Sequence, residues 1–267
     1  MTITRLCSLL VLLLISISSF AQQQETPEFP SGVTDGCFVS LNLKTGVYFR
    51  IHADACQKRF PPFSTFKVPN SLIGLQTGVI KDPDKKWHWD AAKYPVPERA
   101  PSADYKQIWA QDNSMRTALA NSIVWYYREV ATHVGAKRMK GWLDKFDYGN
   151  RDISGGIDRF WLGSSLLISP EEQVHFLTKL SRQKLPVSKE HLALVQEILT
   201  QDKGADFKLV AKTGSSGDGE GWLVGWTEAP KGPCTFALHL KAGSHAEMAE
   251  MRTKLSRDFL KTAGCLP

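Results

Sequence analysis

The order of secondary-structure patterns restricts the possible folds of this sequence more than any other feature. Strand patterns lie at both ends of the chain, and helix patterns lie between them. Helical periodicity dominates residues 115–200 of the 267, and a closing helix is predicted over 246–262. Runs rich in β-branched and aromatic residues indicate strands at 38–42, 47–51, 207–213, 222–227 and 235–240. The sequence therefore predicts an α+β fold, with one antiparallel sheet built from both chain ends and flanked by helices.

The helical middle is predicted to form a lobe inserted between the two halves of the sheet. We place this lobe at roughly residues 79–205, within a single domain of residues 22–267. A capping box at 169–172 (Ser-Pro-Glu-Glu) marks the start of one of its helices. The Pro- and Trp-rich stretch 82–101 is predicted to be a long surface excursion.

Composition excludes several classes of protein. Hydrophobic residues make up 42% of the chain and charged residues 22%, which argues against a disordered tail, a collagen-like fibre or a multi-span membrane protein. The formal net charge is +6, but Lys and Arg are scattered among Asp and Glu and form no basic stripe. We therefore expect no nucleic-acid partner.

The first residues resemble an export signal. Arg5 precedes an apolar run at 9–20, and Ala21 is followed by three glutamines. This pattern predicts a secretory signal peptide over residues 1–21, cleaved after Ala21. A retained anchor is the alternative, but the run is too short for about 30 Å of hydrocarbon, so no stable membrane anchor is expected.

Export makes the cysteines candidates for disulfides, because four remain once Cys7 is removed. Cys37 and Cys56 flank a predicted hairpin, whose outer ends an antiparallel pairing brings together. Cys234 and Cys265 are a possible second pair, and four buried free thiols are the alternative. The cysteines and the seven histidines show no Cys-x-x-Cys or His-x-x-x-His spacing, so no metal site is predicted.

Ser64 and Lys67 lie three residues apart at the start of a helix predicted over 64–78, so both side chains share one face. A serine is a poor nucleophile unless a base takes its proton, and a lysine can do so only when its pKa is depressed. Free N–H groups at a helix start also suit a developing oxyanion. The alternative interpretation is a helix cap followed by a solvated lysine.

Two further motifs follow in the sequence. Ser122 and Val124 precede an apolar helix, where Ser122 is alternatively a simple N-cap. Lys212-Thr213-Gly214 ends a predicted strand. A lysine and a hydroxyl there suit a carboxylate, and glycine lets a substrate backbone lie close; an ordinary Gly-rich turn is the alternative.

Together these motifs resemble, in order and spacing, those of the penicilloyl serine transferases. The narrower resemblance is to the class D, or oxacillinase-type, serine β-lactamases. It is carried by Ser-Thr-Phe-Lys at 64–67, Ser-x-Val at 122–124, Tyr-Gly-Asn at 148–150 and Phe-Trp-Leu at 160–162. The likeness covers essentially the whole mature chain.

This resemblance implies hydrolysis of β-lactam antibiotics through an acyl-enzyme on Ser64, and so antibiotic resistance. It also implies that Lys67 is N-carboxylated by carbon dioxide or bicarbonate and acts as general base in acylation and deacylation, with no other cofactor. Phe66, Val124 and Leu162 would form a dry pocket that keeps the Lys67 amine uncharged. The carbamate anion then needs a donor, for which the Trp161 indole N–H is the candidate.

The remaining roles follow by resemblance. The backbone N–H groups of Ser64 and Ser215 would form the oxyanion hole, and Ser122 would relay a proton to the lactam nitrogen. The predicted carboxylate-binding residues are Lys212, Thr213, Gly214 and Arg252. Tyr148 and Asn150 are predicted to be structural supports at the mouth of the site.

Two other functions stay open at this point. One is a penicillin-binding D,D-peptidase, and the other is a non-hydrolytic β-lactam sensor domain. Val124 and the Phe-Trp-Leu segment at 160–162 argue against the D,D-peptidase. The predicted cleavable leader argues against the sensor domain. The expected partners are small-molecule β-lactams, the expected location is the periplasm, and the sequence does not predict an oligomeric state.

Overall fold

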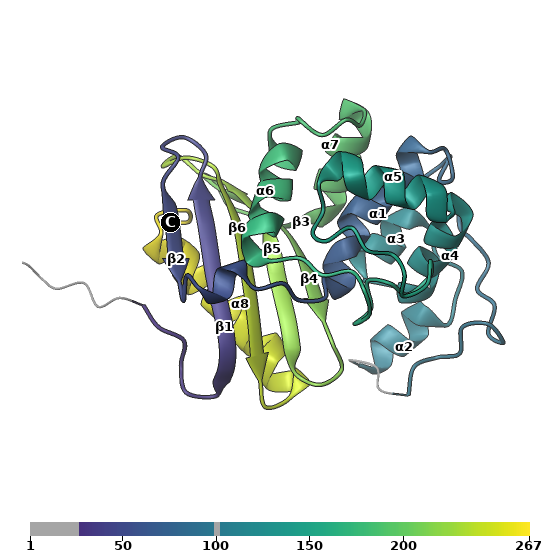
Figure 1. The fold of residues 1–267 in the computed structure, drawn as a ribbon, viewed down its shortest axis with the longest axis horizontal. Coiled ribbons are helices and arrows are strands. Elements are labelled where there is room, and N and C mark those ends of the chain that lie inside the picture. The colour runs from purple at the N-terminus through teal and green to yellow at the C-terminus, as the bar shows by residue number, and fades with distance from the viewer. Residues whose placement is uncertain (1–26, 99–101) are drawn as a thin grey trace, which may run out of the picture.

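The computed structural model describes residues 27–98 and 102–267, so the predicted signal peptide lies outside the described residues. Its centre is one six-stranded antiparallel sheet in the order β2-β1-β6-β5-β4-β3 (Figure 1). The strands are β1 (Val33–Asn42), β2 (Tyr48–Ile51), β3 (Thr200–Lys203), β4 (Lys208–Ser215), β5 (Glu220–Glu228) and β6 (Cys234–Ala242). Because β1 pairs with β6, the two chain ends share the sheet, and the predicted fold class is confirmed.

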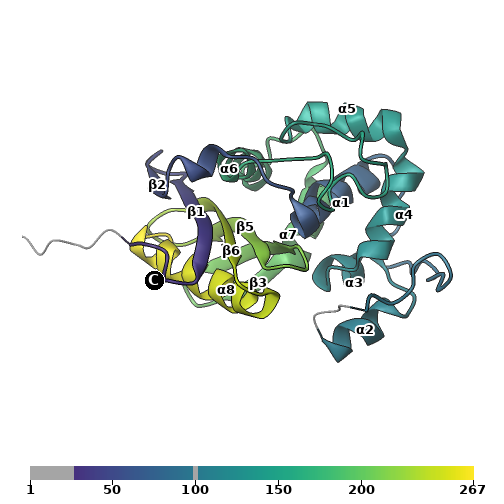
Figure 2. The same ribbon diagram turned by 60° about the horizontal axis from the view of Figure 1, so that its bottom comes forward.

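Helices cover both faces of the sheet, and a group of helices lies beside its β4 side (Figures 1 and 2). The α-helices are α1 (Lys67–Gln76), α2 (Ala103–Trp109), α3 (Met115–Ala120), α4 (Val124–Val134), α5 (Ala136–Phe146), α6 (Pro170–Ser181), α7 (Lys189–Leu199) and α8 (His245–Thr262). Two 3-10 turns, η1 (Ala55–Gln57) and η2 (Phe63–Phe66), precede α1. The chain as one domain with an inserted lobe at 79–205 remains our proposal.

Two apolar cores follow from strand alternation. On β4, Leu209 and Ala211 point into a core shared with α8, whereas Val210 points into the larger core shared with the other helices. The predicted capping box is present at the start of α6, where Ser169 Oγ accepts from Glu172 N and Ser169 N donates to the Glu172 carboxylate. The sheet is thus held between helices on both faces.

The outer edge of β4 is only partly covered. β3 is four residues long and pairs with the first three residues of β4, from Lys208 to Val210. Beyond that pairing, Gln201 donates from Nε2 to the Ala211 carbonyl oxygen at 3.0 Å. Neither β3 nor α2 was predicted, because the short polar sequence of β3 has no alternation to detect. On the side away from β5, residues 212–215 therefore have no neighbouring strand in the described parts of the chain.

Both cysteine pairs form disulfides. Cys37 is bonded to Cys56 across the hairpin, with 5.2 Å between their Cα atoms, and this predicted pair is confirmed. Cys234 is bonded to Cys265, with a Cα–Cα distance of 5.7 Å, so the alternative of four free thiols is wrong. The second bond ties the chain end after α8 to the first residue of β6.

Replacing both Cys234 and Cys265 by alanine is expected to lower the free energy of unfolding by about 3–4 kcal/mol. The reason is that the bond closes a loop with a sequence separation of 31 and so restricts the unfolded chain. Urea denaturation of the variant and of wild type measures the difference, and chemically reduced wild type is the matched control. An unchanged urea midpoint would contradict this account.

Candidate active site

Ser64 lies in a tight turn immediately before α1. The α-helix begins at Lys67, not at Ser64 as predicted, and Ser64 belongs to the 3-10 turn η2. The N-cap of α1 is Phe66, which makes no side-chain cap, so the interpretation of Ser64 as a helix cap is wrong. Instead the Lys67 Nζ donates to Ser64 Oγ at 2.6 Å. The turn therefore places the half-buried Ser64 hydroxyl next to the amine of a lysine three residues later.

Lys67 is fully buried, with 0% of its surface exposed, so the interpretation of a solvated lysine is also wrong. Burial lowers the pKa of Lys67 well below its ordinary value, and the positive charge of Lys212 lowers that pKa further. Within residues 27–98 and 102–267, no carboxylate forms an ion pair with it. These conditions favour the neutral amine, which is the form able to accept a proton or react as a nucleophile.

The side chains predicted to line the Lys67 pocket pack in the larger apolar core, and the Lys67 Nζ lies 5.8 Å from the centroid of the Tyr127 ring. Phe66 and Trp161 are fully buried, with ring centroids 5.3 Å apart, and Val124 and Leu162 are half-buried against the same core. The Trp161 Nε1 is buried and has no hydrogen-bond partner in the described part of the chain. A buried N–H without an acceptor is costly, so this donor is free to bind an acceptor that the described residues do not supply.

The segment that carries Trp161 is fastened at several points. Asn150 Nδ2 donates to the Ser165 carbonyl at 2.8 Å, and its Oδ1 accepts from Leu167 N at 3.0 Å, which closes the loop between them. Tyr148 is fully buried, and its ring lies 5.8 Å from that of Phe66. These contacts fit the predicted supporting roles of Tyr148 and Asn150, which remain predictions.

Two contacts that the sequence did not predict also hold this segment. Arg128, one turn into α4, forms an ion pair with Asp158, three residues before Trp161. Phe63, directly before Ser64, donates its N–H to the Trp161 carbonyl at 3.1 Å. Phe63 does so at a φ of +46°, which is rare for a bulky residue. No sequence pattern signals a strained phenylalanine, so reasoning from motifs missed it.

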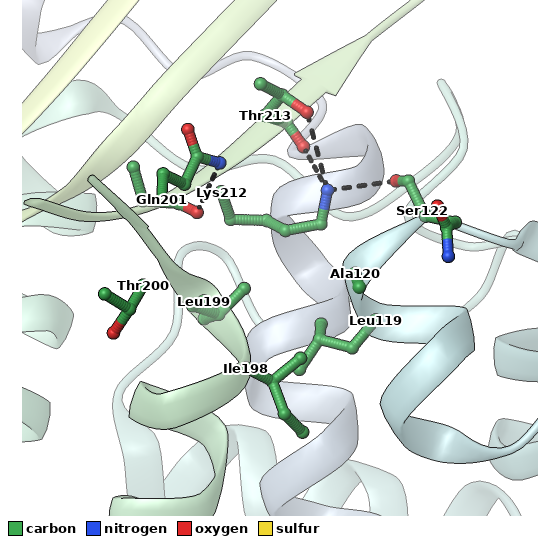
Figure 3. Close-up of a pocket in the computed structure, with 11 residues that line it drawn as sticks. Leu119, Ala120, Ser122, Ile198, Leu199, Thr200, Gln201, Lys212 and Thr213 are labelled. Atoms are coloured by element: carbon green, nitrogen blue, oxygen red, sulfur yellow. Dashed lines mark hydrogen bonds between the residues drawn. The ribbon is translucent and has the colours of Figure 1, made fainter. Parts of the chain in front are cut away.

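Ser122 and Lys212 come from different parts of the fold, and their side chains meet (Figure 3). The Lys212 Nζ donates to Ser122 Oγ and to the Thr213 carbonyl, both at 3.0 Å. Ser122 has a φ of +60°, and the N-cap of α4 is Ile123, so the interpretation of Ser122 as an N-cap is wrong. Burial lowers the pKa of Lys212 to about 7, and the nearby Arg252 charge adds to this. A lysine that can lose its proton near neutrality thus touches Ser122.

A cavity of about 360 Å³ opens beside this pair (Figure 3). It lies between the end of α3, the junction of α7 with β3, and the middle of β4, and is lined by residues 119–122, 198–201 and 211–213. Because Lys212 and Thr213 form part of its wall, the cavity can hold a small molecule beside the strand edge.

Gly214 brings the strand edge up to the turn that carries Ser64. A Cβ atom added to Gly214 would lie 2.8 Å from the Pro62 carbonyl oxygen and 3.0 Å from the Thr65 Cγ2. Only glycine therefore permits this approach, which places Ser215 at the end of β4 beside the same turn. On the other side of the strand, Arg252 of α8 donates from Nη1 to the Gly214 carbonyl at 3.1 Å.

The predicted catalytic, binding and pocket residues thus come from four places in the fold: the start of α1, the start of α4, residues 160–162 and the end of β4 with α8. The two predicted supports, Tyr148 and Asn150, follow α5. In the described residues, no group of three or more His, Cys, Asp or Glu side chains could hold a metal ion. Over the same residues, no helix combines the length and apolar character needed to cross a membrane.

Comparisons with known proteins agree with this geometry. The family described as penicillin binding protein transpeptidase domain matches residues 18–261. The probable β-lactamase YbxI of Bacillus subtilis (strain 168) is 36% identical over 236 residues, 87% of this chain and 82% of that protein. β-Lactamase OXA-48 of Klebsiella pneumoniae is 34% identical over 242 residues, 90% of this chain and 87% of that protein.

Solved structures give the same result. A class D β-lactamase from Bacillus subtilis superposes with a TM-score of 0.75 at 36% identity, covering 86% of this chain and 92% of that one. The class D β-lactamase YbXI from Nostoc gives a TM-score of 0.78 at 33% identity, covering 87% and 95%.

Proposed function

The chain belongs to the class D serine β-lactamases, and we propose that it hydrolyses its substrates through an acyl-enzyme on Ser64, with an N-carboxylated Lys67 as the general base. The observation that carries this mechanism is the environment of the Lys67 amine. It is fully buried, without a carboxylate partner in the described residues, and 2.6 Å from Ser64 Oγ. No metal or other cofactor enters the proposal.

Carboxylation of Lys67 is chemically reasonable in this pocket. A neutral amine adds carbon dioxide, so that one N–C bond forms and one proton leaves, whereas a protonated amine has no free electron pair. The product is an anion, and an anion in an apolar pocket requires hydrogen-bond donors. Trp161 Nε1 is a buried donor without a partner among the described residues, which supports its assignment to this anion.

The proposed reaction then follows from the contacts of each residue. Lys67 takes the Ser64 proton as Ser64 Oγ attacks the lactam carbonyl, while the N–H groups of Ser64 and Ser215 stabilise the oxyanion. Ser122, which accepts from Lys212 Nζ at 3.0 Å, passes a proton to the departing lactam nitrogen. In the second half, Lys67 activates a water that hydrolyses the ester and returns the proton to Ser64.

Substrate binding is assigned to the end of β4. Lys212, Thr213 and Arg252 supply cationic and hydroxyl groups for the carboxylate that β-lactam antibiotics carry, and Gly214 leaves room for the approach. The alternatives of a D,D-peptidase and a sensor domain gain no support from the relatives, which are β-lactamases by name. We further propose a periplasmic location after removal of residues 1–21, and a role in antibiotic resistance.

Acidification from about pH 8 to about pH 5 is expected to lower the turnover of a penicillin by tenfold or more, and added bicarbonate is expected to restore part of it. Burial and the Lys212 charge hold the pKa of Lys67 well below its usual value, so the neutral amine is increasingly favoured as the pH rises. Protonation at lower pH removes the electron pair that holds carbon dioxide. Steady-state rates in degassed buffer, with and without bicarbonate, measure the effect.

Two controls separate this from simple acid denaturation. Far-ultraviolet circular dichroism at each pH checks that the fold persists, and sodium chloride at the same ionic strength replaces bicarbonate. A carbon-13 carbamate signal after addition of labelled bicarbonate reports the modification directly. Turnover that is independent of bicarbonate over the whole range would refute the N-carboxylated base while leaving β-lactam hydrolysis intact.

A further inference from the structure

Three basic side chains lie around the C-terminal end of β4. Lys212 lies on the side of the strand that faces Ser122, and Arg252 of α8 reaches the Gly214 carbonyl. The third is His245, the first residue of α8, whose Nε2 lies 3.5 Å from Ser215 Oγ. His245 is half-buried and was not predicted as a site residue, because a lone histidine at a helix start carries no motif.

The acidic side chains on the neighbouring elements are occupied elsewhere. In the turn between β4 and β5, Asp218 accepts from the Ser216 hydroxyl, and Glu220 at the start of β5 pairs with His239. Glu247 follows the N-cap of α8, and its carboxylate lies beside Gly243. No carboxylate in the described residues therefore pairs with His245, Arg252 or Lys212.

Strand alternation places His245 near the proposed carboxylate site. Side chains two residues apart on a strand share a face and lie about 7 Å from each other, so Thr213 and Ser215 point the same way. Thr213 is a proposed carboxylate ligand, and His245 contacts Ser215. Arg252 lies two helical turns after His245, on the same side of α8. An anion bound between Thr213 and Arg252 would therefore lie close to Ser215 and to the His245 ring that contacts it.

The charges at this edge are unfavourable without an anion. Burial lowers the pKa of His245, and the Arg252 charge lowers it further; burial also lowers the pKa of Arg252 to about 10. The start of α8 adds a partial positive charge of its own. The Arg252 Nε is buried and has no hydrogen-bond partner among the described residues. Its N–H can therefore donate to a bound ligand.

We propose that His245 is a further substrate-binding residue of this enzyme, which in its protonated form strengthens binding of the β-lactam carboxylate at the end of β4. The proposal rests on the function proposed above for Lys212, Thr213 and Arg252. An anion near His245 favours its charged form, so binding takes up a proton. Affinity should therefore rise as pH falls through the pKa of His245, while turnover falls because Lys67 loses its carbon dioxide.

The test uses binding without turnover. The full mature chain with Ser64→Ala is titrated with benzylpenicillin at about pH 8 and about pH 5, and the histidine ring signals are followed by NMR in free and bound protein. We expect the pKa of His245 to rise by about one unit on binding, and the affinity to increase about tenfold at the lower pH. The His245→Gln variant identifies the ring signal and should lose this part of the increase.

The pKa values of Lys212 and Lys67 are also lowered, so pH dependence that persists in His245→Gln is assigned to these two lysines. Two controls complete the experiment: benzylpenicillin methyl ester, which has no free carboxylate, and His88→Gln, which changes an exposed histidine in the loop between α1 and α2. The ester should leave the pKa of His245 unchanged. An equal pKa in free and benzylpenicillin-bound protein would overturn the proposal, whereas absence of turnover in wild type would instead refute the proposed function.

Discussion

Replacing Lys67 by alanine is expected to reduce penicillin hydrolysis by at least about 1,000-fold and to slow acylation and deacylation together, because one base is expected to serve both steps. In the structure, the Lys67 Nζ donates a hydrogen bond to Ser64 Oγ at 2.6 Å. Without it, Ser64 keeps its proton and remains a weak nucleophile. Rapid-mixing kinetics and mass spectrometry of the covalent adduct measure each half of the reaction.

The matched control is Lys140→Ala, since Lys140 is an exposed lysine that pairs with Asp144 on the surface of α5. Surface pairs of this kind contribute little, so this variant should hydrolyse penicillin at the wild-type rate. Thermal unfolding of both variants checks the fold. Normal acylation by Lys67→Ala, followed by a stable acyl-enzyme, would show that Lys67 serves deacylation alone and would contradict the single-base mechanism.

The parts of the fold that the sequence predicts are those fixed by local chemistry. Strand propensity at both ends placed the sheet, and the box at Ser169 placed the start of α6. The Cys37–Cys56 bond followed from a hairpin that needs no long-range information. The three-residue spacing of Ser64 and Lys67 predicted their contact for the same reason, because residues three apart share a face in a 3-10 turn as they do in an α-helix.

The local alternatives that fail, and the misplaced start of α1, concern residues whose conformation is set by contacts distant in sequence. An N-cap serine requires an extended backbone and a free hydroxyl. Ser122 has neither, because its backbone is left-handed and its hydroxyl is bonded to Lys212, 90 residues away. Ser64 lies in a 3-10 turn whose first residue, Phe63, donates its N–H to the Trp161 carbonyl. The local alternative in both places was a helix cap, and these tertiary contacts exclude it.

The Trp161→Phe substitution is expected to slow steady-state turnover in degassed buffer by about 100-fold, because a hydrogen bond to a charged group is worth about 1.5–3 kcal/mol. Phenylalanine keeps most of the ring that packs 5.3 Å from Phe66 but removes the N–H that has no other partner in the described chain. N-carboxylated Lys67 should then lose carbon dioxide more readily. Penicillin should give a burst followed by a trapped acyl-enzyme, because deacylation waits for the base to re-form.

Rescue by bicarbonate distinguishes loss of a donor from loss of packing. Raising the bicarbonate concentration should shift Lys67 back to the carboxylated form and recover turnover in Trp161→Phe, whereas a misplaced loop would not respond to it. The matched control is Trp142→Phe, since Trp142 is a half-buried tryptophan that packs on Phe146 in α5. Trp142→Phe should behave as wild type at every bicarbonate concentration. If Trp161→Phe retains both the carbon-13 carbamate signal and wild-type turnover in degassed buffer, then Trp161 is a packing residue and another group must stabilise the anion.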